Sequence, residues 1–396
     1  MSADEALPEG LPGGLLGELV ALRRELHADP EVGLELPRTQ ARVVDALDGL
    51  GLEITLGVRS TSVVAVLRGA EPGPTVLLRG DMDGLPIAEA TGLSFASTNG
   101  AMHACGHDLH TAALVGAARI LSAQKEDLTG DVVFMFQPGE EGHGGARAML
   151  ADGVLDASGT KPVAAYALHV IADLPHGVFH GRPGPVMAAY STMQVDVIGR
   201  GGHGGRPHEA LDPIPVAAQV ITAAQTYVAR RFSAFDPVVL TFGEFHAGTA
   251  PNVIAEKATL RAGIRTFSAE HTARVASELP ALAEQIAAAS GCRAQVTFTP
   301  VMAPTINDHQ AAAVFEQQAT AIGSYVQLEN PRTGSEDFSE VLSEVPGAFG
   351  YLGAAFPGSP SPAGNHSPRA VFDDSRLEDA ARLLAGCARH HLCTAS

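Results

Sequence analysis

Tryptophan is missing from this sequence of 396 residues, and aromatic residues of all kinds make up only 5% of it. Aromatic platforms on which the bases of a single nucleic-acid strand could stack are therefore scarce. Basic residues are also few, because 26 lysines and arginines stand against 44 aspartates and glutamates, giving a formal net charge of −18. Such a charge repels phosphate backbones and anionic lipid surfaces. We therefore expect neither a nucleic acid nor a membrane as a partner.

Cysteine is also rare, with four residues in the whole chain. This number is far too small for a fold held together by disulfides, and it indicates a reducing, cytoplasmic setting. No apolar run approaches the length of about 18 residues that a membrane-spanning helix needs. The first residues carry acids and turn formers where a secretory signal would need a basic start and an apolar stretch.

The composition is that of a globular protein, with 45% hydrophobic and 18% charged residues. The chain is long enough for two or three domains. In its first half, short apolar runs that end in polar or glycine-rich turns alternate with segments of helical period. This alternation predicts a doubly wound α/β domain. The expected strands are 62–69, 75–83, 131–141 and 162–170, and the expected helices are 15–30, 37–51 and 108–124.

The pattern changes near residue 186, where strands of alternating polarity begin. Expected strands at 190–199, 237–245, 252–267 and 292–300 enclose expected helices at 213–231 and 270–290. Their order, β-α-β-β-α-β, is typical of a ferredoxin-like α+β unit. We therefore expect residues 186–302 to form a separate inserted domain. The catalytic domain would then consist of residues 1–185 and 303–396.

Residues with metal-binding side chains gather at the ends of the expected strands. In open α/β sheets, ligands bind beyond the carboxyl ends of the strands. The residues concerned are Asp81, Asp83, Glu140, Glu141 and His169, together with His103, Cys105, His107, Asp108 and His110 just before a helix. A thiolate, imidazoles and carboxylates together are the donors of a zinc-like or manganese-like site. A Cys105 nucleophile with His107 as its base is the alternative, but it leaves Glu141 and His169 without a role.

Glu140 and Glu141 are neighbours, so their side chains point in different directions from one strand end. One can bind a metal while the other holds a water. In metal-assisted hydrolysis the ion lowers the pKa of water and polarises a carbonyl, and a carboxylate carries the proton to the leaving amine. Two solvated acids on a loop remain the alternative for this pair taken alone.

A glycine-rich segment at residues 199–204, GRGGHG, fits the pattern of a dinucleotide-binding turn. We set this interpretation aside because Pro207 and Pro213 delay the following helix and no acidic residue lies about twenty positions on. The glycines more simply allow the backbone to turn tightly around His203.

Eight ordered segments between residues 15 and 390 resemble the amidohydrolase branch of the aminoacylase and carboxypeptidase metallohydrolases. They are RGDMDGLP, MHACGHDLHTAALVGAA, FQPGEEGHGGA, ALHV, GRGGHGGRPH, PNVIAE, GIRTF and NHSP. That branch includes hippurate hydrolase and the hydrolases of indole-acetyl amino acids. The resemblance implies an α/β catalytic domain with two divalent metal ions and an inserted lid domain that often forms the dimer contact.

The resemblance also implies roles for individual residues. It makes Cys105 the thiolate shared by two metal ions, for which zinc is the first expectation and manganese, cobalt and nickel are alternatives. The other implied ligands are His107, Glu141, His169 and His366. Glu140 becomes the general base, and Asp83 the acid that orients a neighbouring ligand. Asp81 stands where other branches carry a metal-binding histidine, and we leave it out of the ligand set.

In the lid, His203 resembles the residue that donates a hydrogen bond to the oxyanion, in its own subunit or in the partner. Asn252 and Arg265 match positions that contact substrate in relatives, and a guanidinium suits a carboxylate. The chain departs from its relatives at residues 139, 204 and 205, where glycine replaces the usual alanine. We expect the last two glycines to loosen the lid loop.

Together these features predict a metal-dependent amidohydrolase that cleaves the amide of N-acyl L-amino acids. The acyl group would be acetyl, benzoyl or another aryl or alkyl group, and a water bridging the metals would attack it. We expect a homodimer or a higher homo-oligomer formed through the lid. A dipeptidase or a deacetylase of an N-acetylated intermediate is the alternative within this chemistry. A metal-binding relative without catalysis is the alternative outside it.

Overall fold

The computed structural model describes residues 14–356 and 363–393. The chain divides into two compact units, a larger unit of residues 1–186, 306–330 and 340–396 and an inserted unit of residues 187–305 and 331–339. The sequence-based limits of the inserted domain are 186–302, and they leave residues 331–339 in the catalytic domain.

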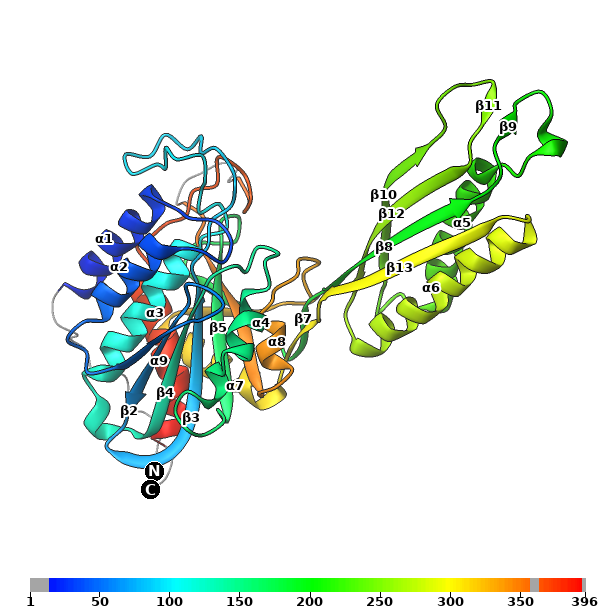
Figure 1. The fold of residues 1–396 in the computed structure, drawn as a ribbon. Coiled ribbons are helices and arrows are strands. Elements are labelled where there is room, and N and C mark those ends of the chain that lie inside the picture. The colour runs from blue at the N-terminus through cyan, green and yellow to red at the C-terminus, as the bar shows by residue number, and fades with distance from the viewer. Residues whose placement is uncertain (1–13, 357–362, 394–396) are drawn as a thin grey trace. The chain divides into compact units, whose positions relative to one another are not determined.

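The larger unit contains a mixed sheet of eight strands in the order β1-β2-β4-β3-β5-β16-β6-β15 (Figure 1). The four central strands are parallel, namely β3 (Glu71–Asp81), β4 (Thr129–Gln137), β5 (Ala164–Ile171) and β16 (Gly347–Gly353). The flanking strands are β1 (Glu53–Leu56), β2 (Val63–Arg68), β6 (Val178–Gly181) and β15 (Ser324–Gln327), and two short strands, β7 (Gly184–Met187) and β14 (Thr305–Asn307), pair with each other. Because parallel strands end at the same edge of a sheet, the residues that follow β3 and β4 lie near the end of β5.

Helices α1, α3, α7 and α9 pack against one another along the sheet. The helices of this unit are α1 (Leu15–Ala28), α2 (Pro37–Leu47), α3 (His107–Ser122), α4 (Gly145–Ala151), α7 (His309–Ile322), α8 (Ser339–Leu342) and α9 (Leu377–Leu392), with 3-10 turns η1 (Lys125–Asp127) and η2 (Val154–Asp156). In α3 only Arg119 and Ser122 are not buried. Its small side chains let it lie between α1, α9 and strand β3. Its first residue, His107, thereby reaches the edge of the sheet at which the parallel strands end.

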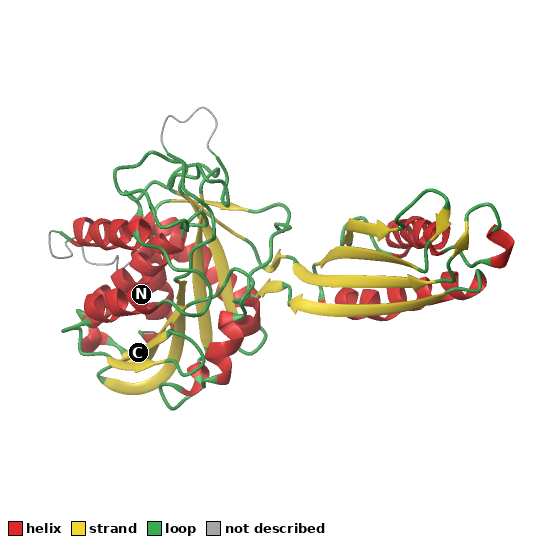
Figure 2. Ribbon diagram, turned by 45° about the horizontal axis from the view of Figure 1, so that its top comes forward, coloured by secondary structure: helices red, strands yellow, loops and turns green. Residues whose placement is uncertain are grey.

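The inserted unit is a four-stranded antiparallel sheet in the order β10-β12-β8-β13. Along the chain it runs β8 (Ala189–Ile198), α5 (Pro213–Arg231), β10 (Val239–Ala247), β12 (Lys257–Thr266), α6 (Ala269–Ala289) and β13 (Arg293–Met302), with β9 (Gly202–His203), η3 (Pro207–Glu209) and β11 (Val253–Ile254) as short additions. Figure 2 shows both long helices on the same face of this sheet. Buried and half-buried residues alternate along β8, as the period of the sequence predicted.

The predicted fold class, an α/β domain accompanied by a ferredoxin-like α+β domain, is confirmed by this topology. The large sheet is mixed rather than wholly parallel, because β2 and β6 run against their central neighbours. None of the helices in the described part of the chain is long and apolar enough to cross a membrane.

Gly116 marks the closest approach among α1, α3 and α9, and we predict that alanine there destabilises the protein. A Cβ atom at this position would lie 2.7 Å from both Ala381 Cβ and Leu19 Cδ1. Alanine normally favours a helix over glycine by about 1 kcal/mol, but overpacking of this kind costs about 1–3 kcal/mol. Thermal unfolding of Gly116→Ala should therefore occur at a lower temperature than in the wild type.

Gly17 in α1 provides the matched control, because it is exposed and no heavy atom lies within 4 Å of a Cβ built there. Gly17→Ala should leave stability unchanged or raise it by up to about 1 kcal/mol. Equal or greater stability of Gly116→Ala would show that the three helices are not packed as described.

Candidate metal centre

The ligand-type residues of the larger unit come from four separate segments of the chain. Cys105 lies in the loop before α3 and His107 is the first residue of that helix. Glu141 follows β4, His169 lies near the end of β5, and His366 lies in the segment between β16 and α9. These are the five residues that the sequence analysis expects as metal ligands, and the fold brings them together at one edge of the sheet.

The sulfur of Cys105 lies at the centre of this group. It is 3.4 Å from His169 Nε2 and 3.3 Å from His366 Nε2. The five residues form two triads, Cys105–His107–His169 and Cys105–Glu141–His366, and within each triad all the potential ligand atoms lie within 4.8 Å of one another. Because Cys105 belongs to both triads, the geometry suits two cations that share one thiolate.

The donor atoms themselves fit divalent cations. His107 donates from Nδ1 to the backbone oxygen of Asp83 at 2.9 Å. This leaves Nε2 as the potential ligand atom, buried and without a hydrogen-bond partner among the described residues. His169 donates from Nδ1 to the backbone oxygen of Val170 at 2.7 Å, so its Nε2 lone pair faces the sulfur. Imidazoles held in this way by a second hydrogen bond are typical of metal ligands. Thiolate, imidazole and carboxylate together fit zinc and similar ions.

Asp83 fixes the two glutamates that follow β4. Its Oδ1 accepts from the backbone N–H of Glu140 at 3.0 Å, and its Oδ2 accepts from that of Glu141 at 3.1 Å. Its own backbone oxygen orients His107. Asp83 therefore orients two expected ligands, His107 and Glu141, and also the expected base, Glu140. This orienting role is wider than the sequence suggested.

Glu140 is buried, and its Oε2 lies 4.0 Å from His107 Nε2. It belongs with His107 and Glu141 to a further group of close ligand-type atoms. It takes no part in the two triads around Cys105. This position beside the triads would allow the carboxylate to handle a proton next to bound metal ions.

Asp81 is fully buried and both of its carboxylate oxygens have strong partners. Oδ1 lies 2.5 Å from His110 Nδ1, and Oδ2 lies 2.5 Å from Arg79 Nη1. Burial alone would raise the pKa of this carboxyl, but Arg79 and the neighbouring histidines hold it well below its ordinary value. Asp81 therefore neutralises buried cations, and we keep it outside the proposed ligand set.

His366 has an unusual backbone conformation. Its φ of 67° is the only positive value at a non-glycine residue in the described part of the chain. The backbone N–H donates to Ala104 oxygen at 2.8 Å, and Nε2 lies 3.1 Å from Glu141 Oε1. The sulfur of Cys105 and then Glu141 raise the pKa of this imidazole to about 10. It therefore carries a proton at neutral pH while no metal is bound.

The remaining predicted residues belong to the inserted unit. His203 lies exposed in β9 and accepts at Nδ1 from the backbone N–H of Gly205 at 3.0 Å, which leaves the proton of a neutral ring on Nε2. Asn252 lies beside it, and its backbone oxygen accepts from Gly204 N–H at 2.8 Å. A Cβ at Gly204 would lie 3.0 Å from that oxygen. Glycine at position 204 therefore permits a close backbone approach, while the expected loosening of the loop by the two glycines stays a prediction.

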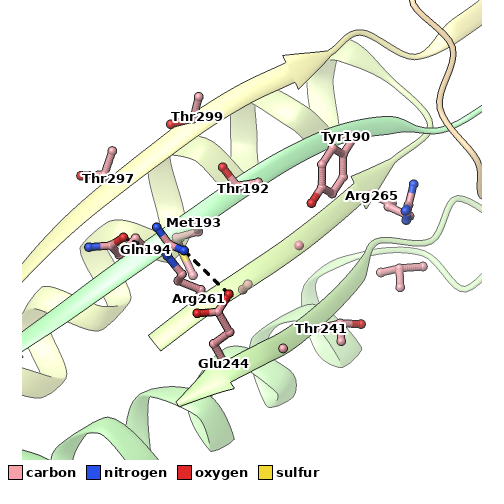
Figure 3. Close-up of a pocket in the computed structure, with 14 residues that line it drawn as sticks. Tyr190, Thr192, Met193, Gln194, Thr241, Glu244, Arg261, Arg265, Thr297 and Thr299 are labelled. Carbon is pink, nitrogen blue, oxygen red and sulfur yellow. Dashed lines mark hydrogen bonds and ion pairs between the residues drawn. The ribbon is translucent and has the colours of Figure 1, made fainter. Parts of the chain in front are cut away.

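Arg265 lies on β12 beside Tyr190 of β8 (Figure 3). Its Nη1 donates to the backbone oxygen of Thr333 at 2.7 Å and to Ser335 Oγ at 3.2 Å. Its Nε and Nη2 make no hydrogen bond within the described residues. Both side chains line a pocket of about 770 Å³ on the sheet face opposite the helices. Part of the guanidinium thus remains available for an anion.

A buried polar cluster that sequence reasoning missed lies next to the ligand loop. Asp108, the residue after His107, pairs with Arg23 at 2.7 Å and with His27 at 2.7 Å. His27 is also 3.2 Å from Glu89. From the sequence, Asp108 is expected only among the residues of metal-binding type. The sequence signal for the cluster is limited to charged residues at positions of a helix that are otherwise apolar. The cluster anchors the first turn of α3, which carries His107.

Metal binding should compete with the proton on His366. Because the pKa of this imidazole is raised to about 10, a cation can bind Nε2 only after the proton leaves, and affinity should rise with pH. Competition with a chelating indicator gives the Zn²⁺ affinity at each pH, and the slope of its logarithm against pH gives the number of protons released on binding. Between about pH 7 and 9 we expect this slope to be smaller by about one proton in His366→Gln than in the wild type. His208→Gln is the control, because it replaces an exposed histidine, and it should keep the wild-type slope. Equal slopes for His366→Gln and wild type would contradict the assignment.

Comparisons with known proteins agree with this geometry. The profile of Peptidase family M20/M25/M40 matches residues 77–390. An N-acetyl-L-cysteine deacetylase of Bacillus subtilis is 35% identical over 376 residues, which are 95% of this chain and 88% of that protein. The IAA-amino acid hydrolase ILR1-like 4 of Arabidopsis thaliana is 35% identical over 382 residues, 94% and 86% of the two chains.

Two solved structures share the whole fold. A putative aminohydrolase from methicillin-resistant Staphylococcus aureus has a TM-score of 0.90 at 31% identity, covering 95% of this chain and 97% of that one. A dinuclear metal binding peptidase of Bacillus subtilis has a TM-score of 0.84 at 31% identity, covering 96% and 99%. The chain therefore belongs to peptidase family M20/M25/M40, in the amidohydrolase and aminoacylase-like branch that its sequence segments resemble.

Proposed function

We propose that this protein of the M20 family is an amidohydrolase that releases the amino acid from N-acyl L-amino acids with the help of two divalent metal ions. The observation that carries the proposal is the pair of triads that share the sulfur of Cys105, with Glu140 beside them. The proposed ligands are Cys105, His107, Glu141, His169 and His366. Zinc fits the thiolate and imidazoles first, while manganese, cobalt and nickel also suit such a site.

When bound, the metal ions would lower the pKa of water and polarise the scissile carbonyl. Glu140 takes the proton of the attacking water and delivers it to the leaving amine. Asp83 keeps Glu140 in position through the backbone N–H of that residue. The burial of Glu140 excludes bulk water from the carboxylate, so the proton it takes is kept for the amine.

We expect residues of the inserted unit, in the same subunit or in a partner subunit, to supply contacts to the substrate. His203 carries its proton on Nε2 and donates it as a hydrogen bond to the carbonyl oxygen while negative charge develops there. Arg265 offers Nε and Nη2 to the carboxylate of the amino acid, because among the described residues only its Nη1 makes hydrogen bonds. Asn252 lies beside His203 and offers its amide to the substrate.

Three further parts of the proposal have separate support. The names of the relatives include a deacetylase and an amino acid hydrolase, which supports an amide of an amino acid as the substrate. An N-acetyl deacetylase or a dipeptidase is the competing specificity, and a metal-binding protein without catalysis is the competing function. All four cysteines are unpaired, which supports a reducing cytoplasmic setting. The inserted unit presents β10 as an edge strand, which supports a homo-oligomer formed through this unit.

Activity towards acetyl, benzoyl and indole-acetyl amino acids and towards dipeptides tests the proposed function directly. We expect hydrolysis of acyl amino acids by metal-loaded protein and none after chelation. Glu140→Gln keeps the shape of the side chain but cannot take a proton, so turnover should fall by about 10²- to 10⁴-fold while the metal content stays at the wild-type level.

Glu126→Gln supplies the control, because its carboxylate is exposed in η1. It should hydrolyse the same substrates at the wild-type rate. Near-normal turnover by Glu140→Gln would remove this residue from the mechanism. A metal-loaded wild type that is inactive on the whole panel would instead favour the non-catalytic alternative.

Association through the edge of the inserted sheet can be tested with two phenylalanines. Phe245 on β10 is 42% exposed, and Phe235 in the preceding loop is fully exposed. We expect sedimentation equilibrium to give a dimer or higher oligomer for the wild type and for Phe235→Asp, and monomers for Phe245→Asp, because a buried carboxylate would disfavour strand pairing. A monomeric wild type, or an unchanged assembly of Phe245→Asp, would contradict the proposal.

A further inference from the structure

Asn365, the residue before His366, has a side-chain amide whose orientation is fixed by its surroundings. Its Oδ1 accepts from the backbone N–H of Ala172 at 2.9 Å. Because a backbone N–H can pair only with the oxygen of an amide, Nδ2 must face the other way. There it lies 3.1 Å from Val170 oxygen, 3.3 Å from Cys105 oxygen and 3.8 Å from Cys105 Sγ.

These contacts connect three ligand-bearing segments that are distant in sequence. The oxygen of Val170 also accepts from His169 Nδ1, so the atom that sets the tautomer of His169 is held by Asn365. The backbone of Cys105 is held by the same amide. The adjoining residue, His366, is fixed to the cysteine loop through Ala104.

The contact with the sulfur has an electronic consequence as well. An N–H group directed at a thiolate stabilises the lone pairs that the sulfur would give to a metal ion. Hydrogen bonds around a cysteine ligand are known to tune metal sites in this way. The amide of Asn365 is half-buried, so bulk water competes only partly for this contact.

We propose that Asn365 is a positioning residue of the metal centre. It keeps Cys105, His169 and His366 in fixed positions relative to one another and reduces the electron density that the shared thiolate donates to a metal ion. This inference rests on the proposed function, because it requires metal ions at the two triads. It assigns no contact between Asn365 and the substrate or a metal ion.

Asn307 supplies a matched control. Its amide donates to the backbone oxygens of Arg182 and Phe349 at 2.9 Å and accepts from Phe349 N–H at 2.7 Å. Like Asn365 it links strands and loops of the larger unit through backbone groups. Its hydrogen bonds reach none of the five proposed ligands. A purely structural effect should therefore appear equally in variants of both residues.

The experiment titrates metal-free wild type, Asn365→Ala and Asn307→Ala with Co²⁺ and records the absorption band of sulfur-to-cobalt charge transfer. Asn365→Ala should bind Co²⁺ about 10- to 100-fold more weakly, as expected for loss of a group that supports ligands. Its band should move to longer wavelength, because the sulfur loses an N–H donor. Asn307→Ala should keep the affinity and the band of the wild type, even where thermal unfolding shows lower stability.

Each outcome decides the inference. Wild-type affinity and an unmoved band in Asn365→Ala would overturn it while the proposed metal centre stands. A wild-type protein that shows no sulfur band would overturn the proposed centre and the inference with it. If circular dichroism shows that Asn365→Ala does not fold, Asn365→Leu fills the same volume without polar atoms and takes its place in the same comparison.

Discussion

The sulfur of Cys105 sets the central constraint on this structure, because both triads of ligand-type atoms include it. Four chain segments must end within a few ångströms of one atom. A parallel sheet solves this problem, since β3, β4 and β5 end at one edge and α3 begins there. The alanine-rich sequence of α3 follows from the same constraint, because only small side chains let the helix that carries His107 lie deep between α1, α9 and the sheet.

The constraint also requires charges to be buried in balanced groups. Burial alone would lower the pKa of His107, but Asp81 and Asp83 raise it well above its ordinary value. Burial and the neighbouring His110 hold the pKa of His169 well below its ordinary value. The two rings thus meet opposite electrostatic environments within one centre, and the carboxylates that favour a proton on His107 equally favour a cation there. The site attracts positive charge before any metal binds.

The sequence predicts much of this, for identifiable reasons. The period of β8, α5, β10, β12, α6 and β13 is regular, so the ferredoxin-like unit follows from local pattern alone. The metal site also follows from local pattern, because residues of metal-binding type stand directly after strands that the pattern locates. His366 came only from the family resemblance, because its place depends on a positive φ and on a contact with a loop some 260 residues earlier. Asn365 escaped notice because a half-buried amide leaves no periodic signal, and residues 331–339 join the inserted unit through long-range contacts.

The two units differ in how they hold their functional groups, and this difference has a chemical meaning. Glu140, His107 and His169 are buried and fixed by backbone hydrogen bonds, which suits steps that need constant distances and little water. His203 is exposed in β9, and Asn252 is exposed just before β11, the strand that pairs with β9. Glycine at position 204 permits the close approach of the backbone there. Groups that recognise a substrate can change with little effect on a core to which they do not belong. With the roles proposed for His203 and Asn252, changes in these exposed loops would alter substrate choice and leave the buried centre unchanged.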